Sequence, residues 1–268
     1  MSGRLLAALA VGFIAATGCA RKPAGPQPPP PAPPLTAWPQ GSTAPQTITA
    51  ALVLAIPLQY ERSALEDGKA PRWPFPGAGG RTEVRFEFFL PDFSGYTLQN
   101  YRNDLDENKV EIIYLHAGDS HEAEPDAPGE YPPNMLKRSL QEHLNPKDYR
   151  DMYGLRCYTS RLLTDRLTCY GRRDAAAGED ILLYVPQMTP ASAPNAFPTL
   201  KANYFSRKYG GVRIAWRTHV RNLPRWHDID AQIWRFIDAW KVAAPPPAPP
   251  APPAPAAPAA PAAPANRN

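Results

Sequence analysis

Alternation of apolar and polar residues is the clearest pattern in the middle of the chain. In the segment 211–220, five side chains fall on one face: Val212, Ile214, Trp216, Thr218 and Val220. Such alternation is typical of a strand with one buried face. The same criterion predicts strands at 51–62, 81–90 and 109–116. Shorter apolar runs predict further strands at 155–160, 166–172 and 181–185.

Two segments have the spacing of helices instead. The segment 133–144 carries apolar side chains three and four residues apart, namely Met135, Leu136, Leu140 and Leu144. A longer stripe near the end of the chain contains Trp226, Ile229, Ile233, Phe236, Ile237 and Trp240. Asn222 and Pro224 precede that stripe as a possible N-cap and first turn. The pattern predicts an α+β fold: a mostly antiparallel sheet with a C-terminal amphipathic helix packed on it.

Proline divides the chain into parts. Most of the 36 prolines lie in residues 23–45 and in the Ala/Pro-rich end of the chain. Such stretches carry too little apolar surface to fold and favour extended polyproline II. The expected organisation is a signal peptide at 1–18, a tether at 19–45, one globular domain at 46–242 and a disordered tail at 243–268.

The amino-terminal segment indicates export. Arg4 precedes an apolar stretch at 5–16, which is too short to span a bilayer and has the length of a signal peptide core. The next residues, Ala16-Thr17-Gly18-Cys19, resemble the lipobox of bacterial lipoproteins. The resemblance implies cleavage before Cys19 and acyl chains on that residue. By its similarity to Gram-negative sorting signals, Ala20 favours the outer membrane, with the domain in the periplasm. The alternative is an ordinary secretory signal with an incidental cysteine.

The other two cysteines agree with an oxidising compartment. Cys157 and Cys169 fall in two neighbouring predicted strands, and a hairpin between those strands would bring the thiols together. We therefore predict a disulfide. The alternative, a pair of zinc ligands, usually requires a Cys-x2-Cys pair or further Cys and His nearby. We predict no metal and no other cofactor.

The formal charge of +4 carries little information about the domain. Four of the 29 basic residues lie in the signal, tether and tail, which leaves 25 against 25 acidic residues. A nucleic-acid-binding domain is expected to be strongly basic. The near neutrality of this domain therefore argues against nucleic acid as a partner.

The candidate catalytic motif is incomplete. Gly118-Asp119-Ser120 resembles the first block of the GDSL esterases, but no Asp in the chain is followed three residues later by the His that would act as the base. A polar surface turn is the preferred interpretation, and we predict that the chain is not an enzyme. The acidic stretch 119–130, with His116 and His121, could hold a metal. Its spacing matches no metal motif, so a solvated loop is preferred and metal binding stays open.

A basic stripe leads from the strand at 211–220 into the final helix. It contains Arg213, Arg217, His219 and Arg221, which could form a docking surface for an acidic partner. The alternative is pairing of these side chains with acids on neighbouring strands. Trp234 lies off the centre of the helical stripe and is a further candidate for partner binding. Its alternative role is core packing.

The carboxy-terminal part of the domain resembles a group of proteobacterial lipoproteins. The resemblance rests on the segments 204–206, 209–212 and 216–220, and on Trp226, Ile229-Asp230 and Ile233-Trp234. Some members of that group are similar to immunity partners of type VI secretion effectors. The resemblance implies a non-enzymatic protein that binds and blocks an incoming toxin. The alternative is a structural or assembly lipoprotein of the envelope or of a secretion system, for which the stiff tail would serve as a spacer.

Overall fold

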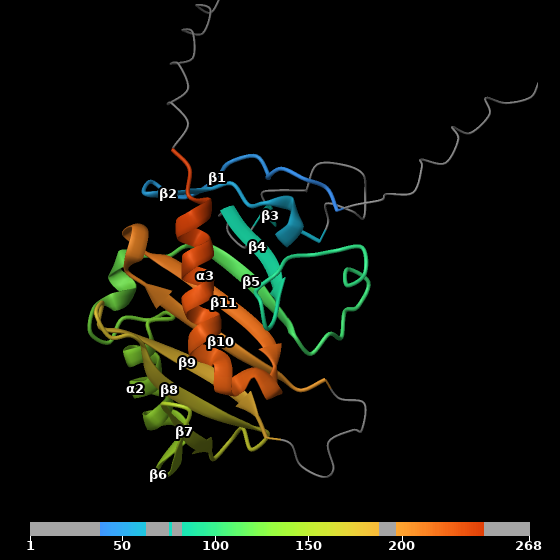
Figure 1. Ribbon diagram of the computed structural model, residues 1–268. Helices are drawn as coiled ribbons and strands as arrows, with labels where there is room; N and C mark the ends of the chain where they lie inside the picture. The colour runs from blue at the N-terminus through green and yellow to red at the C-terminus, as the bar shows by residue number, and fades with distance from the viewer. Residues whose placement is uncertain (1–37, 63–74, 77–81, 188–196, 244–268) are drawn as a thin grey trace, which may run out of the picture. The chain divides into compact units, whose positions relative to one another are not determined.

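The computed structural model describes residues 38–62, 75–76, 82–187 and 197–243 (Figure 1). The predicted signal peptide, the lipid anchor at Cys19 and all but the first residue of the predicted tail lie outside these residues. The described residues fall in the unit Thr36–Asn268. Within them, no helix combines the length and the hydropathy needed to cross a bilayer.

An antiparallel sheet forms the body of the fold. Among the described residues it has nine strands, in the order β3-β4-β5-β11-β10-β9-β8-β7-β6. Their bounds are β3 Phe75–Pro76, β4 Thr82–Phe89, β5 Lys109–Ala117, β6 Leu144–Met152, β7 Leu155–Ser160, β8 Arg166–Asp174, β9 Glu179–Pro186, β10 Thr199–Ser206 and β11 Val212–His219. A separate hairpin pairs β1 (Gln46–Thr49) with β2 (Leu52–Leu54). The predicted strands at 81–90, 109–116, 155–160, 166–172, 181–185 and 211–220 are confirmed.

Among the described residues, one α-helix packs on one face of this sheet. Figure 1 shows α3 (Trp226–Trp240) lying across the strands, as the α+β prediction requires. The α-helix begins at Trp226, after the 3-10 turn η4 (Val220–Arg225), so Asn222 is not its N-cap. Asn222 is buried instead, and its amide donates to Glu107 O at 2.7 Å and to Thr218 Oγ1 at 2.8 Å. This side chain thus joins the start of η4 to the loop before β5.

The main core lies between α3 and the sheet. Ile229 and Ile233 are fully buried against the inward side chains of the central strands. At the end of the helix, Trp240 stacks on Phe236 at 4.7 Å between ring centroids and meets Phe86 edge to face at 4.9 Å. Each fully buried apolar side chain of this kind contributes about 1.5–3 kcal/mol. The apolar stripe that predicted the helix is therefore also what holds it.

A buried polar cluster ties the middle of α3 to the sheet. The carboxylate of Asp230 accepts hydrogen bonds from Tyr204 Oη and from Trp216 Nε1, the latter at 3.3 Å. Its other oxygen lies 3.2 Å from Nε of Arg173, whose side chain is only 4% exposed. Burial raises the pKa of Asp230, and the charge of Arg173 opposes that rise. Trp234 completes the cluster by donating to Tyr204 Oη at 3.1 Å.

The packed region begins before the predicted boundary at Gln46. Trp38, which the sequence placed in the tether, is buried and donates from Nε1 to Leu58 O at 2.7 Å. Its ring stacks on Tyr96 at 5.2 Å. Thr43 is also buried, and its hydroxyl accepts from the amide of Ile56 at 3.0 Å. Residues 38–45 therefore pack on the domain, because an indole at the end of a Pro-rich stretch supplies the apolar surface that the prolines lack.

The strand predicted at 51–62 is only partly correct. It ends at Leu54 as β2, and residues Leu58–Tyr60 form the 3-10 turn η1. Pro57 stands between them with an extended backbone, and Leu58 N donates back to Gly41 O at 3.0 Å. The proline interrupts the strand, as its missing N–H would suggest.

The predicted disulfide is confirmed. Cys157 on β7 lies directly opposite Cys169 on β8, and the two are bonded. Both residues are fully buried on the face of the sheet that α3 covers, within the main core. The bridge fixes the register of the β7–β8 hairpin.

Candidate functional site

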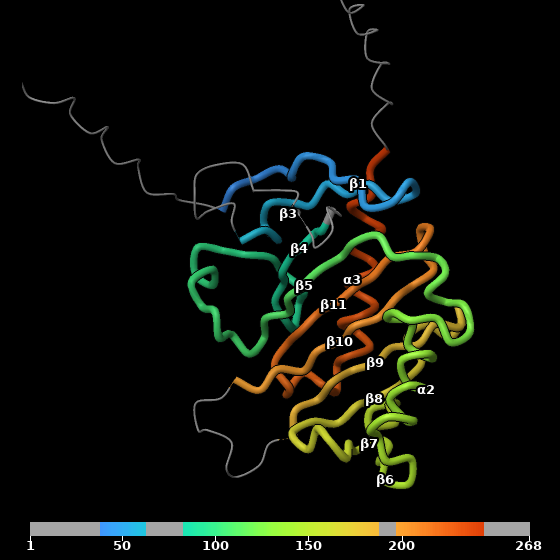
Figure 2. The backbone as a smooth tube through the Cα atoms, turned by 180° about the vertical axis from the view of Figure 1, so that it is seen from behind, coloured from blue at the N-terminus to red at the C-terminus, as the bar shows by residue number. Residues whose placement is uncertain are grey.

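The face of the sheet opposite α3 is only partly covered. Figure 2 shows this side, where α2 (Pro132–Glu142) packs near β6 and β9. The segment that precedes α2 crosses the ends of β5, β11 and β10, and Phe205 N donates to Glu130 O there at 3.0 Å. Among the described residues, no helix lies over the centre of β5, β11 and β10. We call this region the open face.

A line of side chains crosses the open face from strand to strand. The cross-strand register places Tyr184 of β9, Lys201 of β10, Arg217 of β11, Glu111 of β5 and Glu87 of β4 opposite one another in turn. Side chains that face each other across antiparallel strands lie about 5 Å apart at Cβ. The line therefore runs from an aromatic residue through two basic residues to two acidic ones, and we call it the cross-strand row.

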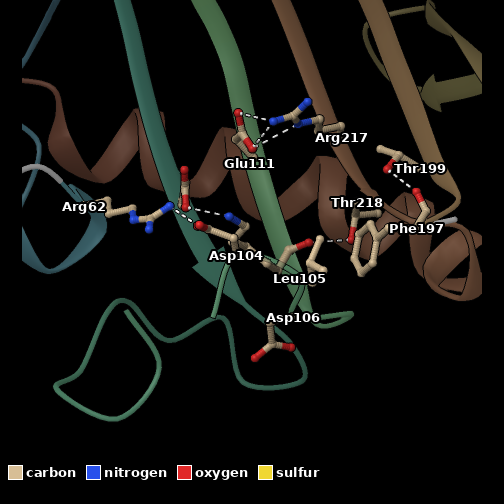
Figure 3. A pocket seen from close by; sticks show the side chains of 11 residues that line it. Arg62, Asp104, Leu105, Asp106, Glu111, Phe197, Thr199, Arg217 and Thr218 are labelled. Carbon is tan, nitrogen blue, oxygen red and sulfur yellow. Dashed lines mark hydrogen bonds and ion pairs between the residues drawn. The ribbon is translucent and has the colours of Figure 1, made fainter. Parts of the chain in front are cut away.

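The centre of the row is held in a fixed geometry. Arg217 Nε donates to Glu111 Oε2 at 3.0 Å, and Arg217 Nη2 donates to both carboxylate oxygens at 3.0 and 2.8 Å. The arginine side chain is still 52% exposed. Figure 3 shows this two-pronged contact at the upper edge of a cleft. The guanidinium is thus oriented by its neighbour and remains accessible from solvent.

A first cleft of about 420 Å³ lies beside the acidic end of the row (Figure 3). Glu87, Lys109 and Glu111 line its floor, and Leu105, which is 67% exposed, stands at its rim. Burial raises the pKa of Glu87 to about 7, although Lys109 at 3.5 Å lowers it and Glu111 opposes Lys109. Arg62 and Asp104 form an ion pair on the same wall. The cleft holds a mixture of charges and has an apolar rim.

A second cleft of about 570 Å³ adjoins the first, with Thr199 and Arg217 common to both. Its lining is basic and aromatic rather than acidic. It comprises Ile113, Asp165, Arg166, Tyr184, Pro186, Thr199, Lys201 and Arg217. The two clefts together therefore follow the cross-strand row on both sides of Arg217.

The acidic stretch 119–130 is mostly exposed, as in the solvated loop that we preferred, but one of its carboxylates is buried. The Glu122 side chain is only 4% exposed, and it accepts from Arg213 Nε at 2.7 Å, Asp119 N at 3.0 Å and Glu130 N at 3.1 Å. Glu130 in turn accepts from Tyr114 Oη at 2.9 Å. Two acids thus pin the segment onto the sheet. Within the described part of the chain, no three His, Cys, Asp or Glu side chains are grouped as metal ligands would be.

The Gly118-Asp119-Ser120 motif has a structural explanation. Asp119 caps the short 3-10 turn η2 (Ser120–Ala123) by accepting from His121 N at 3.0 Å, and Glu122 closes the reciprocal bond. A Cβ at Gly118 would lie 2.7 Å from the ring of Phe205, so only glycine fits there. The motif that resembles an esterase block is therefore a capping box on a tight turn.

The structure separates the basic stripe that the sequence suggested. Arg213 is taken up by Glu122, and Arg221 binds Glu107 and donates to Asn108 Oδ1 at 2.7 Å. His219 packs its ring on Phe197 at 4.8 Å. Of the four, only Arg217 lines the clefts. These contacts match the alternative of pairing with neighbouring acids, while partner binding by these side chains stays a prediction.

Trp234 belongs to α3, on the other face of the sheet, and is buried there. It is 6% exposed, and Arg173 and Lys208 lie over its ring at 4.8 and 5.0 Å. Trp234 is thus a core residue whose ring is covered by two cationic side chains. A role in partner binding stays a prediction for this residue as well.

Three residues of the second cleft were not predicted as site residues from the sequence: Arg166, Tyr184 and Lys201. Tyr184 and Arg166 were in or beside predicted strands, but their faces were not assigned. Lys201 lies in β10, which was not predicted. The signal was present, since Leu200, Ala202 and Tyr204 alternate with Thr199, Lys201 and Asn203.

Comparisons with known proteins add a distant similarity. No family model matches the chain, and no curated protein matches it. Among solved structures, it is similar to Smlt3025, described as an immunity protein of the Stenotrophomonas maltophilia type IV secretion system. The match has 11% identity and a TM-score of 0.49, and it covers 76% of this chain and 95% of that one. Such a likeness assigns no function.

Proposed function

We propose that this chain is an outer-membrane-anchored periplasmic lipoprotein that binds a protein partner and thereby neutralises a secreted antibacterial toxin. The observation that carries the binding role is the open face, where charged side chains oriented by the sheet lie exposed between two clefts. The anchor and the compartment rest on the lipobox resemblance at Cys19 and on the cysteine pair.

The size of the open face favours a protein over a small molecule. The cross-strand row spans five strands. At about 4.8 Å between strands, it extends about 20 Å. A standard protein interface buries about 800 Å² on each partner, and the width of such a patch is comparable with the length of the row. The clefts are continuous with this surface, so side chains of a partner could enter both while its backbone lies along the row.

The open face also has the composition of an interface. Arg and Tyr are enriched in protein-binding surfaces, and here Arg217 lies in the middle of the cross-strand row and Tyr184 at one end of it. An exposed leucine, Leu105, stands at its edge beside the first cleft. Because the strands and the Arg217–Glu111 contact already fix these side chains, binding would require little further ordering.

A contact-dependent competition tests the neutralising role. A strain lacking this gene is mixed on a solid surface with its own parent, and survivors of each are counted. We expect the deletion strain to lose at least about tenfold in number and to be restored by the plasmid-borne full chain. Equal survival of the two strains would overturn the proposal and favour the alternative of an envelope assembly protein.

A further inference from the structure

We infer that the second cleft receives an acidic segment of the protein partner, with the carboxylates placed at Lys201 and Arg166. This inference rests on the proposed function and deepens it, since it names the surface and the chemistry of the segment that binds there. The occupant is a loop or strand of a protein that carries Asp or Glu beside an apolar residue.

The basic groups of the second cleft are only partly neutralised. Arg217 is bound by Glu111, whereas the ammonium group of Lys201 has neither a hydrogen bond nor an ion pair with any described residue. Arg166 meets only its chain neighbour Asp165, at 3.2 Å, in a pair that is exposed on both sides. With Arg217 neutralised by Glu111, the charges of Lys201 and Arg166 against that of Asp165 still leave the cleft positive. Exposed ion pairs of this kind contribute about 0–1 kcal/mol, so a partner's carboxylate can displace Asp165 at little cost.

The basic groups of the second cleft come from strands of the sheet. Arg166, Lys201 and Arg217 come from β8, β10 and β11, so the sheet and not a loop sets their spacing. Tyr184 of β9 lies between them and provides a flat aromatic floor. Backbone pairing holds all four strands, and the disulfide on β8 adds a further constraint. The positive cleft is therefore a rigid, pre-formed feature.

Apolar side chains lie around the charges of the second cleft. Ile113 and Pro186 line the walls, and the turn that leads to Asp165 exposes Leu162, at 74%, and Leu163. A cleft of about 570 Å³ has the size of a side-chain or ligand pocket, which is about 300–1,000 Å³. A concave pocket with apolar walls suits an inserted protein segment. A lipid headgroup layer would need the basic groups on a protruding surface.

The test uses two charge-reversal variants of the full mature chain. Lys201→Glu changes the cleft, whereas Arg235→Glu makes the same change in charge on the exposed side of α3, which packs on the other face of the sheet. Circular dichroism and thermal unfolding of both variants, and of Lys201→Ala, establish that the fold is retained. A loss of binding then reports on the cleft and not on stability.

The first readout is fluorescence anisotropy with a labelled oligoglutamate peptide containing leucine. We expect Lys201→Glu to weaken binding about tenfold or more, Lys201→Ala to weaken it less, and Arg235→Glu to leave it within about twofold. Oligolysine should not bind at the cleft. The affinity of Lys201→Ala for oligolysine should therefore be no lower than that of wild type. Peptide binding that is equal in wild type and Lys201→Glu would overturn the inference. Preference for phosphatidylglycerol vesicles over the peptide would also overturn it.

The second readout is the competition between the deletion strain and its parent, with each variant supplied on a plasmid. We expect Arg235→Glu to restore survival and Lys201→Glu to fail. If Lys201→Glu protects as well as wild type, the inference is wrong while the neutralising role stands. If wild type itself gives no protection, the proposed function is wrong, and the peptide measurement alone decides whether the cleft binds acidic segments.

Discussion

The buried carboxylate of Asp230 should be among the most sensitive single positions in the domain. In Asp230→Ala, Arg173 would stay buried with Glu179 as its remaining carboxylate, at 3.0 Å. Tyr204 Oη and Trp216 Nε1 would both lose their acceptor. Removing one partner of a buried pair costs about 3–5 kcal/mol. For a domain of this size, that corresponds to a fall in melting temperature of about 6–20 °C.

Urea unfolding followed by tryptophan fluorescence measures this change directly. The matched control is Asp238→Ala on the same helix, because Asp238 pairs with Lys208 at 2.9 Å in an exposed site and should contribute less than about 1 kcal/mol. The double variant Arg173→Met/Asp230→Leu should be more stable than Asp230→Ala, since it removes the buried guanidinium together with its carboxylate, while Glu179, which is 12% exposed, keeps the hydrogen bonds from Ser206 Oγ and Arg207 N. A loss below about 1 kcal/mol for Asp230→Ala, or one equal to that of Asp238→Ala, would refute the reasoning.

Three further predictions concern the disulfide, the first cleft and the segment 119–130. The double variant Cys157→Ala/Cys169→Ala opens a loop with a sequence separation of 12 and should lose about 3 kcal/mol in urea unfolding, whereas the reduced wild type should match it. Burial raises the pKa of Glu87 from 4.5 to about 7, so the folded state binds this proton more tightly than the unfolded state, and stability should fall as pH rises from about 4.5 to 7. Glu87→Gln should remove that pH dependence. The variant should be more stable than wild type by roughly 1–3 kcal/mol at pH 8 but not at pH 4. Stabilities of variant and wild type that change in parallel with pH would contradict this. Glu122→Ala should free the segment that it pins, so the amides of residues 119 and 130 should exchange hydrogen at least about tenfold faster, and unchanged exchange would show that other contacts hold the segment.

The sequence was most informative where one face of an element is buried and the other is not. The segment 211–220 and the stripe of α3 meet that condition, and both were predicted correctly. In β10 the pattern fails at its end, because Phe205 on the open face is covered by the segment around Glu130 and is as buried as Tyr204 on the other face. In β6 the opposite holds: it is an edge strand with mostly exposed residues, so no apolar face marks it.

The candidate site could be predicted only in part for a related reason. The alternation of apolar and polar residues within β11 was enough to predict that Arg217 points away from the core. Lys201 lies in β10, which was not predicted, and Tyr184 lies in β9, for which no pairing partner was predicted. The register that aligns them with Arg217 is set by pairing along the whole sheet. The burial of Glu122 could not be foreseen either, because it depends on Arg213, which lies 91 residues further along the chain.

We propose above all that this chain binds a secreted toxin and blocks its activity. The most direct measurement is capture of the tagged full mature chain from the envelope of its own bacterium, followed by native mass spectrometry and an activity assay of the captured protein before and after its release. We predict a complex of near-equal stoichiometry with a secreted hydrolase that is inactive while bound and active once released. Capture of envelope machinery or wall fragments alone, or of a hydrolase that stays active in the complex, would contradict the account.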